Sequence, residues 1–237
     1  MKKLFLIFSL FSLATIQSCI YVNDRDDIPP RGESTRTYDF RNFDELEMGH
    51  AFQVNVQEGA AYAVSATGEL NDLDDLEIFV QEEKLVARYR NSWRNREPMN
   101  IDITMPTLAA VDFSGAIDSQ IEGFSNLSKL EIELSGASKC DFIGSAKTID
   151  FDLSGASQLY LSGNGQFLDG ELSGASQLDA LDLPVEESDL KLSGASDAKV
   201  WASKFLEVDA SGASSVRYKG DPAIKQNLSG GSTLRRQ

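Results

Sequence analysis

Residues 130–137 read Leu-Glu-Ile-Glu-Leu-Ser-Gly-Ala, and near copies of this stretch recur toward the end of the chain. The copy at residues 149–156 reads Ile-Asp-Phe-Asp-Leu-Ser-Gly-Ala. The tripeptide Ser-Gly-Ala, which is Ser-Gly-Gly in the last copy, begins at Ser114, Ser135, Ser154, Ser173, Ser193, Ser211 and Ser229. The intervals between these serines are 21, 19, 19, 20, 18 and 18 residues. A repeat of this length indicates an architecture of stacked units.

Apolar and polar residues alternate on both sides of each tripeptide, which is the pattern of a half-buried β-strand. Glu131 and Glu133 separate three apolar residues before one copy, and Leu159 and Leu161 form an apolar pair after the next. Each repeat therefore supplies two short strands and a glycine turn. A coil of about 19 residues at about 3.3 Å per residue has a perimeter of roughly 60 Å. The sequence predicts an all-β fold, a single-chain parallel β-helix (β-solenoid). Right-handed winding is expected only because it is the default for parallel crossovers.

The tripeptide suits a tight corner. Glycine tolerates unusual backbone angles, serine can hydrogen-bond around the turn, and we expect the alanine to point inward where space is short. Ser-Gly-Ala is not the Gly-x-Ser-x-Gly nucleophile elbow, and His50 is the single histidine of the chain, so we expect no catalytic serine. Cys140 occupies the same position as Leu159 in its repeat, which predicts a small buried side chain rather than a reactive thiol.

The first residues are typical of a targeting segment, because Lys2 and Lys3 precede the apolar run 4–16. This run is too short to span a membrane as a helix. Residues 16–19, Ile-Gln-Ser-Cys, resemble a bacterial lipobox. Two interpretations remain, an ordinary secretory signal or a lipoprotein in which lipidated Cys19 begins the mature chain. We expect the second, with the lipid anchor in the outer membrane and the protein on either its surface or its periplasmic side.

The domain organisation follows from these patterns. We expect a signal peptide at 1–18, a flexible polar and Pro-containing tether at 19–37, and one β-helix domain at 38–234. Within that domain, residues 38–107 are predicted to form irregular coils that continue and cap the solenoid, and 108–234 the regular repeats. A separate small β domain at the N-terminal side is the alternative.

The residues also resemble a known family. The similarity rests on Phe43-Asp44-Glu45-Leu46-Glu47, on residues 52–59 and 101–106, and on the Ser-Gly-Ala series, and it covers about residues 38–234. The chain is similar to the "putative auto-transporter adhesin, head GIN domain" family, common as lipoproteins in Bacteroidetes. The resemblance implies a β-helix and an adhesin-like role, and it supplies no catalytic residues.

The outer face of the predicted solenoid is acidic. The chain has 22 basic and 37 acidic residues, and removal of Lys2 and Lys3 with the signal segment leaves 20 and 37, a net charge of −17. Nucleic acid is therefore not an expected partner. Counting back from each serine aligns two outward columns, Glu131, Asp150, Asp169, Asp189, Glu207 and Glu133, Asp152, Glu171, Lys191, Asp209. Like charges about 4.8 Å apart repel, so this face either binds a cation such as Ca²⁺ or is simply solvated. We expect no dedicated metal site.

Other surface residues suggest further hypotheses. Tyr160 and Trp201, on the strands after the corners, could stack against a glycan, or complete packing at a corner. Asp179 and Lys199 are predicted to pair across adjacent coils. The basic and aromatic cluster Arg88, Tyr89, Arg90, Trp93, Arg94 and Arg96 is expected to pair with nearby acids rather than bind nucleic acid.

Two function classes fit these features. The first is a non-enzymatic, adhesin-like surface module that binds a glycan, a protein or its own copies. The second is a β-helix carbohydrate-active enzyme, such as a polysaccharide lyase or a glycosidase. The narrow range of repeat lengths argues against long insertions that build a catalytic cleft, so the first class is favoured.

Overall fold

The computed structural model describes residues 29–91 and 95–237. The predicted signal peptide, Cys19 and most of the predicted tether lie outside the described residues. Within them, the chain forms one 17-stranded sheet and one short helix. In chain order the elements are β1 (Glu33–Tyr38), β2 (Glu45–Met48), β3 (Phe52–Glu58), β4 (Ala63–Glu69), α1 (Leu70–Asp75), β5 (Leu76–Gln81), β6 (Lys84–Tyr89), β7 (Met99–Met105), β8 (Ala110–Phe113), β9 (Asp118–Glu122), β10 (Leu127–Leu134), β11 (Lys139–Leu153), β12 (Gln158–Leu172), β13 (Gln177–Leu192), β14 (Asp197–Ala210), β15 (Ser215–Lys219), β16 (Ala223–Leu228) and β17 (Thr233–Arg236).

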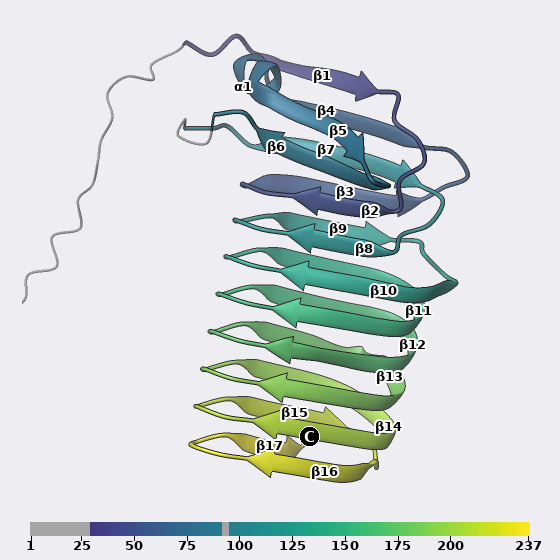
Figure 1. The fold of residues 1–237 in the computed structure, drawn as a ribbon, viewed down its shortest axis with the longest axis vertical. Coiled ribbons are helices and arrows are strands. Elements are labelled where there is room, and N and C mark those ends of the chain that lie inside the picture. The colour runs from purple at the N-terminus through teal and green to yellow at the C-terminus, as the bar shows by residue number, and fades with distance from the viewer. Residues whose placement is uncertain (1–28, 92–94) are drawn as a thin grey trace, which may run out of the picture.

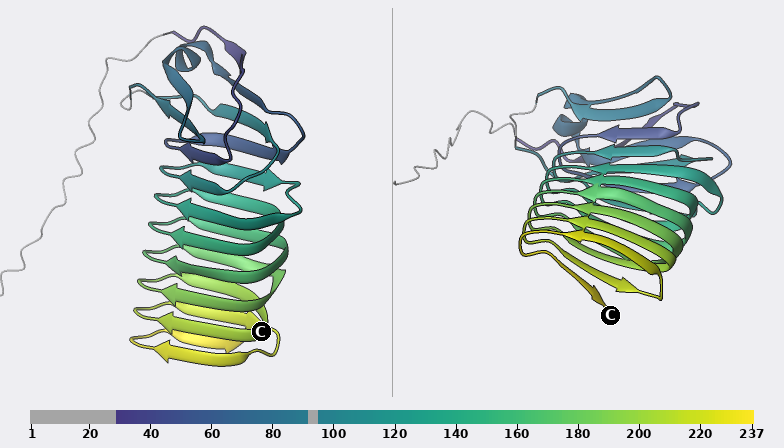
Figure 2. Two further views of the ribbon diagram at one scale, coloured as in Figure 1. Left: turned by 45° about the vertical axis from the view of Figure 1, so that its right-hand side comes forward. Right: turned by 60° about the horizontal axis from the view of Figure 1, so that its bottom comes forward.

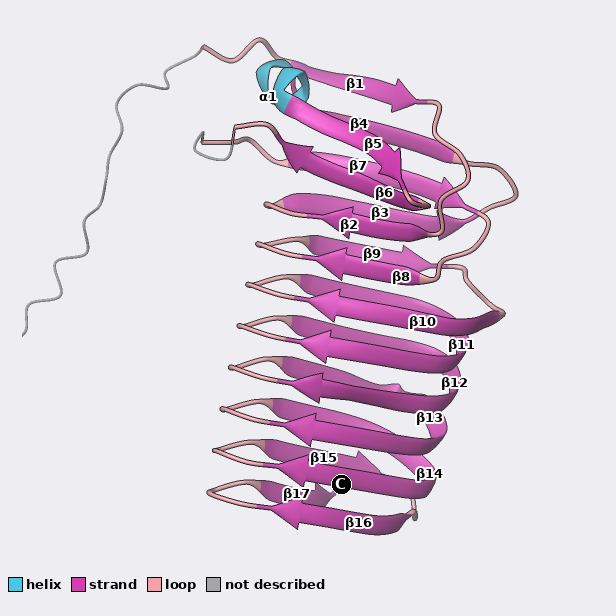
Figure 3. Ribbon diagram, in the orientation of Figure 1, coloured by secondary structure: helices cyan, strands magenta, loops and turns pink. Residues whose placement is uncertain are grey.

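The predicted β-solenoid is confirmed. From β8 to β17 all strand pairs are parallel, and the coils stack into a tall column (Figure 1). The continuous sheet wraps around the core, and each coil is flattened, so that it contributes one segment to each of two opposite faces, which we call the two sheets (Figure 2). Loops gather at one narrow corner, whereas at the other corner the long strands β11 to β14 run through the bend (Figure 3).

The N-terminal part departs from simple coiling. β2 and β3 stack between β6 and β7 on one side and β8 and β9 on the other, so the spatial order differs from the chain order. β1 and β4, β4 and β7, and β5 and β6 are antiparallel pairs that continue the two sheets. The turn between β5 and β6 uses Glu82 and Glu83, both with positive φ, at 52° and 65°. Because neither residue is glycine, the sequence carried no clear signal for this reversal.

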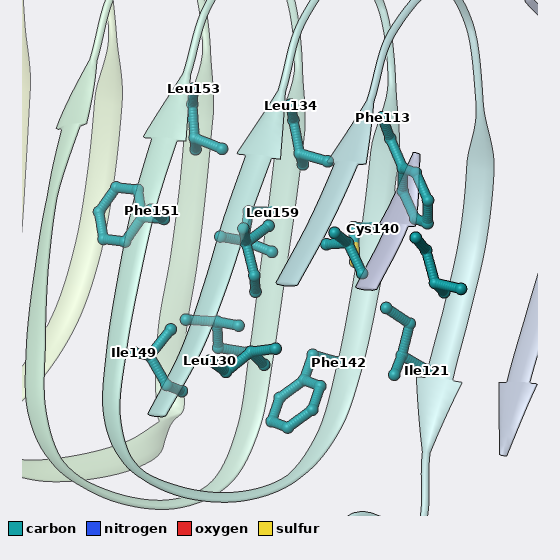
Figure 4. Packing of buried hydrophobic residues seen from close by; sticks show 14 of the residues in the cluster. Phe113, Ile121, Leu130, Leu134, Cys140, Phe142, Ile149, Phe151, Leu153 and Leu159 are labelled. Carbon is teal, nitrogen blue, oxygen red and sulfur yellow. The ribbon is translucent and has the colours of Figure 1, made fainter. Parts of the chain in front are cut away.

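The core fills the space between the two sheets. Figure 4 shows Phe113, Leu130, Phe142 and Leu159 pointing into it, and each is at most 1% exposed. Cys140 is fully buried beside Leu159, and burial raises the pKa of its thiol to about 12, so it stays protonated. The predicted burial of this cysteine is confirmed.

The corner has the sequence Ser-Gly-Ala-Ser in most coils, and its fourth residue is the one that points inward. Ala137 is exposed while Ser138 is buried, and the same holds at the four following corners. The expectation that alanine faces inward was therefore wrong. Ser138 Oγ donates to the Ser135 carbonyl at 2.9 Å, and this bond recurs at 2.8–3.0 Å at the next four corners. The hydroxyl of the buried serine thus closes the turn from inside. An alanine at this position would have no hydroxyl to donate to the carbonyl.

Glycine is required at the corner for two reasons. Gly174 has a φ of 74°, and a Cβ placed on it would lie 2.5 Å from the Gly155 carbonyl oxygen of the preceding coil. The next amide, of Ala175, donates to that same oxygen at 2.8 Å. The glycines therefore form a column in which the backbones touch.

We expect Gly174→Ala to destabilise the protein by at least about 2 kcal/mol, since the left-handed backbone and the steric overlap add. Denaturant unfolding monitored by circular dichroism measures this. The control is Ala175→Ser at the neighbouring exposed position, which should stay within about 0.5 kcal/mol of the wild type. Equal unfolding midpoints for Gly174→Ala and the wild type would contradict this account of the corner.

Candidate functional site

The two acidic columns lie where the sequence places them. Glu131 pairs in register with Asp150, and Asp150 with Asp169; Glu133 pairs with Asp152, and Asp152 with Glu171. Asp189, Lys191, Glu207 and Asp209 continue both columns along β13 and β14. The structure adds Asp112 and Glu47 to the second column, on β8 and β2. The predicted alignment is thus confirmed and extends beyond the regular repeats.

A groove of about 460 Å³ runs between these columns, and we call it the acidic groove. Its walls are outward carboxylates from β10 to β13, and its floor is the strand segment that carries Ile132, Phe151 and Gly170. The Phe151 side chain points inward and covers Gly170, where a Cβ would lie 2.7 Å from the Phe151 ring. The acidic groove is lined by Glu131, Ile132, Glu133, Asp150, Phe151, Asp152, Asp169, Gly170, Glu171, Asp189 and Lys191.

Lysines offset part of the repulsion in the acidic groove. Lys129 bonds both Glu131 and Asp150, the latter at 2.9 Å, and these partners raise the pKa of Lys129. Lys191 lies 2.8 Å from Glu171. Lys225 lies 2.6 Å from Glu207 at the end of the first column. These pairs are exposed, so each contributes little stability on its own.

Other carboxylates of the columns lack such partners. Within the described residues, no ion pair is formed by Glu133, Asp152, Asp169, Asp189 or Asp209. Partial burial raises the pKa of Asp169, and the neighbouring charges of Asp150 and Asp189 raise it further. Burial and Glu207 likewise raise the pKa of Asp189. The middle of the acidic groove therefore keeps unbalanced negative charge.

The groove does not have the geometry of a metal site. Across the described ranges 29–91 and 95–237, no three His, Cys, Asp or Glu side chains come together in a way that could hold a metal ion. The Ca²⁺ hypothesis thus gains no support from the positions of these carboxylates.

The two aromatic candidates for glycan stacking do not form one platform. Tyr160 on β12 is 37% exposed, and its hydroxyl donates to Gln158 Oε1 at 3.1 Å. Trp201 on β14 is half-buried, and Lys219 Nζ lies 3.6 Å from the centre of its ring. Because Lys219 covers one ring face, Trp201 offers little free surface. On the same sheet, the predicted pair of Lys199 and Asp179 is present at 2.7 Å.

The arginine cluster pairs with acids, as expected. Arg88 lies 3.3 Å from Glu77, and Arg96 bonds Asp72 at 3.0 Å and also Asp75. Arg96 also lies over the Tyr89 ring at 3.8 Å. Trp93 and Arg94 lie outside the described residues.

His50 packs against Tyr89, with ring centres 5.3 Å apart. Its Nδ1 is buried and, within the described part of the chain, has no hydrogen-bond partner. Burial and then Arg96 lower the pKa of His50, which keeps the imidazole neutral. In the described part of the chain no corner serine is bonded to it, and the hydroxyls of Ser114, Ser173 and Ser211 donate to backbone carbonyls.

A second hollow, of about 410 Å³, escaped the sequence analysis. It lies on the sheet opposite the acidic groove, across β1, β4 and β7, and we call it the tyrosine cleft. It is lined by Thr37, Tyr38, Asp39, Tyr62, Ala63, Val64, Ser65, Asp102 and Thr104. The antiparallel strand pairs of the N-terminal part bring these residues together. These pairs could not be predicted from a sequence repeat, because this part of the chain has none. The two tyrosines near small polar residues were the one available signal.

The sequence profile of the family described as "Putative auto-transporter adhesin, head GIN domain" matches residues 42–222. The chain belongs to this family. No curated protein matches the chain. Among the described residues of this head GIN protein, no helix is long and apolar enough to cross a membrane.

Solved structures share the fold. A "putative adhesin" from Bacteroides fragilis superposes with a TM-score of 0.77 at 21% identity, over 88% of this chain and 99% of its own. A "putative adhesin" from Parabacteroides distasonis superposes with a TM-score of 0.72 at 18% identity, over 87% of this chain and 97% of its own. A "putative lipid binding protein" from the same species superposes with a TM-score of 0.68 at 16% identity, over 88% of this chain and 98% of its own. At these identities the likeness concerns the fold alone.

The raised pKa of Asp169 predicts how stability depends on pH. Because the folded state takes up this proton more readily than the unfolded state, the charged carboxylate destabilises the fold at neutral pH, and that effect is lost as the pH falls. Asp169→Asn keeps an oxygen for the Asp189 amide, which donates to Asp169 Oδ1 at 3.1 Å. We expect Asp169→Asn to raise the free energy of unfolding by about 0.5 kcal/mol at pH 7.5, and we expect this gain to vanish near pH 3.5.

Urea unfolding at the two pH values measures the gain. The control is Glu171→Gln in the same groove, which loses the ion pair with Lys191 and should show no gain at pH 7.5. A gain for Asp169→Asn that is the same at both pH values would count against charge repulsion as its cause.

Proposed function

We propose that the chain is a non-enzymatic, adhesin-like lipoprotein of the cell envelope that binds a partner through the outer faces of its solenoid. Membership of the head GIN family supports an adhesin-like role at the cell surface or envelope. The observation that carries the proposal is the acidic groove, where aligned columns keep unpaired carboxylates along several coils. Such a face suits a cationic segment of a protein partner, because ladders of like charge favour a counter-charged ligand.

The position of the described chain ends supports a particular orientation for the proposed anchor. The described residues begin at the capped end, beside β1, and β17 lies at the opposite end (Figure 1). With a lipid on Cys19, the capped end would face the membrane and the regular coils would extend away from it. This orientation leaves the acidic groove accessible along the side of the column.

The alternative, a β-helix carbohydrate-active enzyme, has less support. The regular corners are short and near-identical, so no long loop from them encloses a cleft. The buried corner serines, such as Ser138, donate hydrogen bonds to backbone carbonyls, and His50 packs against aromatic rings. A carbohydrate enzyme of this fold would need acids that converge on one bond, whereas the acids of the groove lie side by side in columns.

Lipid anchoring is tested with Cys19→Ala. We expect the wild type in the membrane fraction and the variant in the soluble fraction after cell disruption, because a lipid chain is the proposed anchor. Immunoblotting of the two fractions, with mass spectrometry of the mature N-terminus, gives the result. A processed Cys19→Ala protein that remains in the membrane fraction would refute the lipoprotein assignment.

Binding by the acidic groove is tested with a synthetic lysine-rich peptide as the probe. Neutralising the unpaired Glu133, Asp152 and Asp189 to the amides should weaken peptide binding roughly tenfold, as three exposed ionic contacts of about 0.5 kcal/mol each imply. The matched control neutralises Asp118, Glu122 and Asp141 on the opposite sheet, which changes the net charge equally. Equal weakening by both triple variants would show that net charge alone attracts the peptide, and cleavage of any polysaccharide in a panel would overturn the non-enzymatic assignment.

A further inference from the structure

The last coil of the solenoid, formed by β16 and β17, has an open edge, and we call it the end coil (Figure 2). β16 pairs with β14, and β17 pairs with β15. In the described part of the chain, no strand pairs with the other edge of β16 or β17. Backbone groups left unpaired along a sheet edge are a template for pairing with a further strand.

The end coil exposes apolar side chains at positions that the preceding coil buries. Ile224 pairs with Leu206, and Leu228 pairs with Ala210. Both β14 residues are fully buried, whereas Ile224 is 42% exposed and Leu228 is 36% exposed. Their side chains share the inward phase of the strand and have no further coil beneath them. The end of the hydrophobic core is therefore uncovered at this edge.

The free backbone groups belong to these same inward-phase residues. The amide of Ser229, which directly follows β16, donates to the Ala210 carbonyl of β14 at 2.9 Å. Since the amides and carbonyls of successive strand residues point to opposite sides, every second residue counted back from Ser229 faces β14. The residues between them turn their amides and carbonyls to the free edge, and these are Ile224, Gln226 and Leu228.

The sequence of β16 is complementary to a second copy of itself. A two-fold axis at Gln226 places two copies of the strand side by side and antiparallel, with Ile224 opposite Leu228 of the second copy. Gln226 then lies opposite Gln226, and Lys225 lies opposite Asn227. In this register the residues with free backbone groups exchange hydrogen bonds, and inward side chains meet inward side chains.

The acidic columns end where this contact would form. In the preceding coil the columns carry Glu207 and Asp209, and β16 places Lys225 and Asn227 at the same positions. Lys225 Nζ lies 2.6 Å from Glu207, and Asn227 Nδ2 donates to Asp209 at 3.3 Å. Acids at these two positions would place carboxylates opposite carboxylates across the axis. A lysine opposite an asparagine avoids that repulsion.

These features favour one occupant of the open edge. The backbone groups, the apolar pair and the uncharged Lys225–Asn227 opposition all match when the added strand is β16 itself, which is the self-complementarity of a two-fold contact. We infer that two copies of this chain associate end to end, with β16 against β16 in the antiparallel register centred on Gln226.

The consequence for adhesion rests on the proposed function. The two-fold axis is perpendicular to the column, so the capped ends of the two copies point in opposite directions (Figure 1). With a lipid anchor beside each capped end, the pair would join two facing membranes. The pairing and the proposed function can fail separately, because β16 belongs neither to the acidic groove nor to the anchored segment.

Salt should strengthen this association. Without the signal segment the chain has 20 basic and 37 acidic residues, so two copies repel each other at a distance. The end coil also brings Arg235 and Arg236 of both copies together, and among the described residues only Arg236 has an acidic partner, Asp221 at 3.3 Å. Salt screens both repulsions. Docking of the basic end coil on the acidic groove of another copy would instead be weakened by salt.

The test is sedimentation velocity of the purified full chain with Cys19→Ala, which removes the proposed lipid, from micromolar to near-millimolar concentration. We expect a reversible monomer–dimer equilibrium whose dissociation constant falls severalfold when NaCl is raised from about 0.05 M to about 0.5 M. A chain that stays monomeric at every concentration overturns the inference. Association that salt weakens, and that neutralising Glu133, Asp152 and Asp189 abolishes, also overturns it, because the groove would then form the contact.

Two variants disrupt the edge in different ways. Gln226→Pro removes an amide that points to the free edge, so no bond to β14 is lost and the melting temperature should be retained. Ile224→Lys places a charge opposite Leu228. We expect each to weaken association at least tenfold. The matched control is Ile143→Lys, at a 47% exposed isoleucine on the side of the column, which should associate like the wild type. Wild-type association of either edge variant, or equal weakening by Ile143→Lys, contradicts the inference.

Gln226→Cys tests the register. Directly opposite residues of a hydrogen-bonded antiparallel pair have Cα atoms about 5.5 Å apart, which a disulfide can bridge. Cys140 is buried and does not compete. In the Cys19→Ala chain, mild oxidation should join Gln226→Cys into a covalent dimer and leave Ile143→Cys monomeric. The proposed pairing is wrong if Gln226→Cys fails to cross-link where the chain is dimeric, or if both variants cross-link equally.

Discussion

At each regular corner, the carbonyl oxygen of one glycine occupies the space that a Cβ on the next glycine would need. The distance from that oxygen to the hypothetical Cβ is 2.4–2.5 Å from Gly136 to Gly212. The following amide donates to the same oxygen at 2.7–2.8 Å, so each corner is hydrogen-bonded to the one before it. This contact fixes the height and the register of successive coils. Because the register is fixed on both sides of the corner, the outward and inward positions there fall into columns, whereas the register shifts near the opposite bend, as between Ala180 and Pro184.

The columns explain both the packing of the core and the negative charge of the outer face. Inside, apolar side chains stack above one another, and a local mismatch is absorbed where Phe151 covers Gly170. Outside, acids repeat because the strand before each corner repeats, and the lysines Lys129, Lys191 and Lys225 interrupt the repulsion at intervals. A repetitive sequence thus produces a continuous face of one charge. Such a face suits a binding surface, whereas catalysis needs groups that converge on one point.

The repeat explains how much of this could be predicted. Alignment of Glu131 with Asp150, or of Cys140 with Leu159, needs only the repeat length and the alternation of strands. The inward residue of the corner was predicted wrongly because hydrophobicity favours burial of Ala137 over Ser138. In the structure Ser138 is buried instead, since its hydroxyl donates a hydrogen bond to the Ser135 carbonyl inside the turn. The N-terminal part lacks a repeat, so its antiparallel pairs and the turn at Glu82 and Glu83 had no template. The tyrosine cleft depends on those pairs, and therefore only the structure shows it.

The central claim is that the coils are equivalent units held in register by their corners. It is tested most directly by deleting one whole coil, residues 173–192, which joins Leu172 to Ser193 and restores a strand followed by Ser-Gly-Ala. The measurement is urea unfolding of the shortened chain, monitored by circular dichroism. We predict a β-sheet spectrum, one cooperative transition and an m-value smaller in proportion to the surface lost. Loss of the cooperative transition would contradict the account.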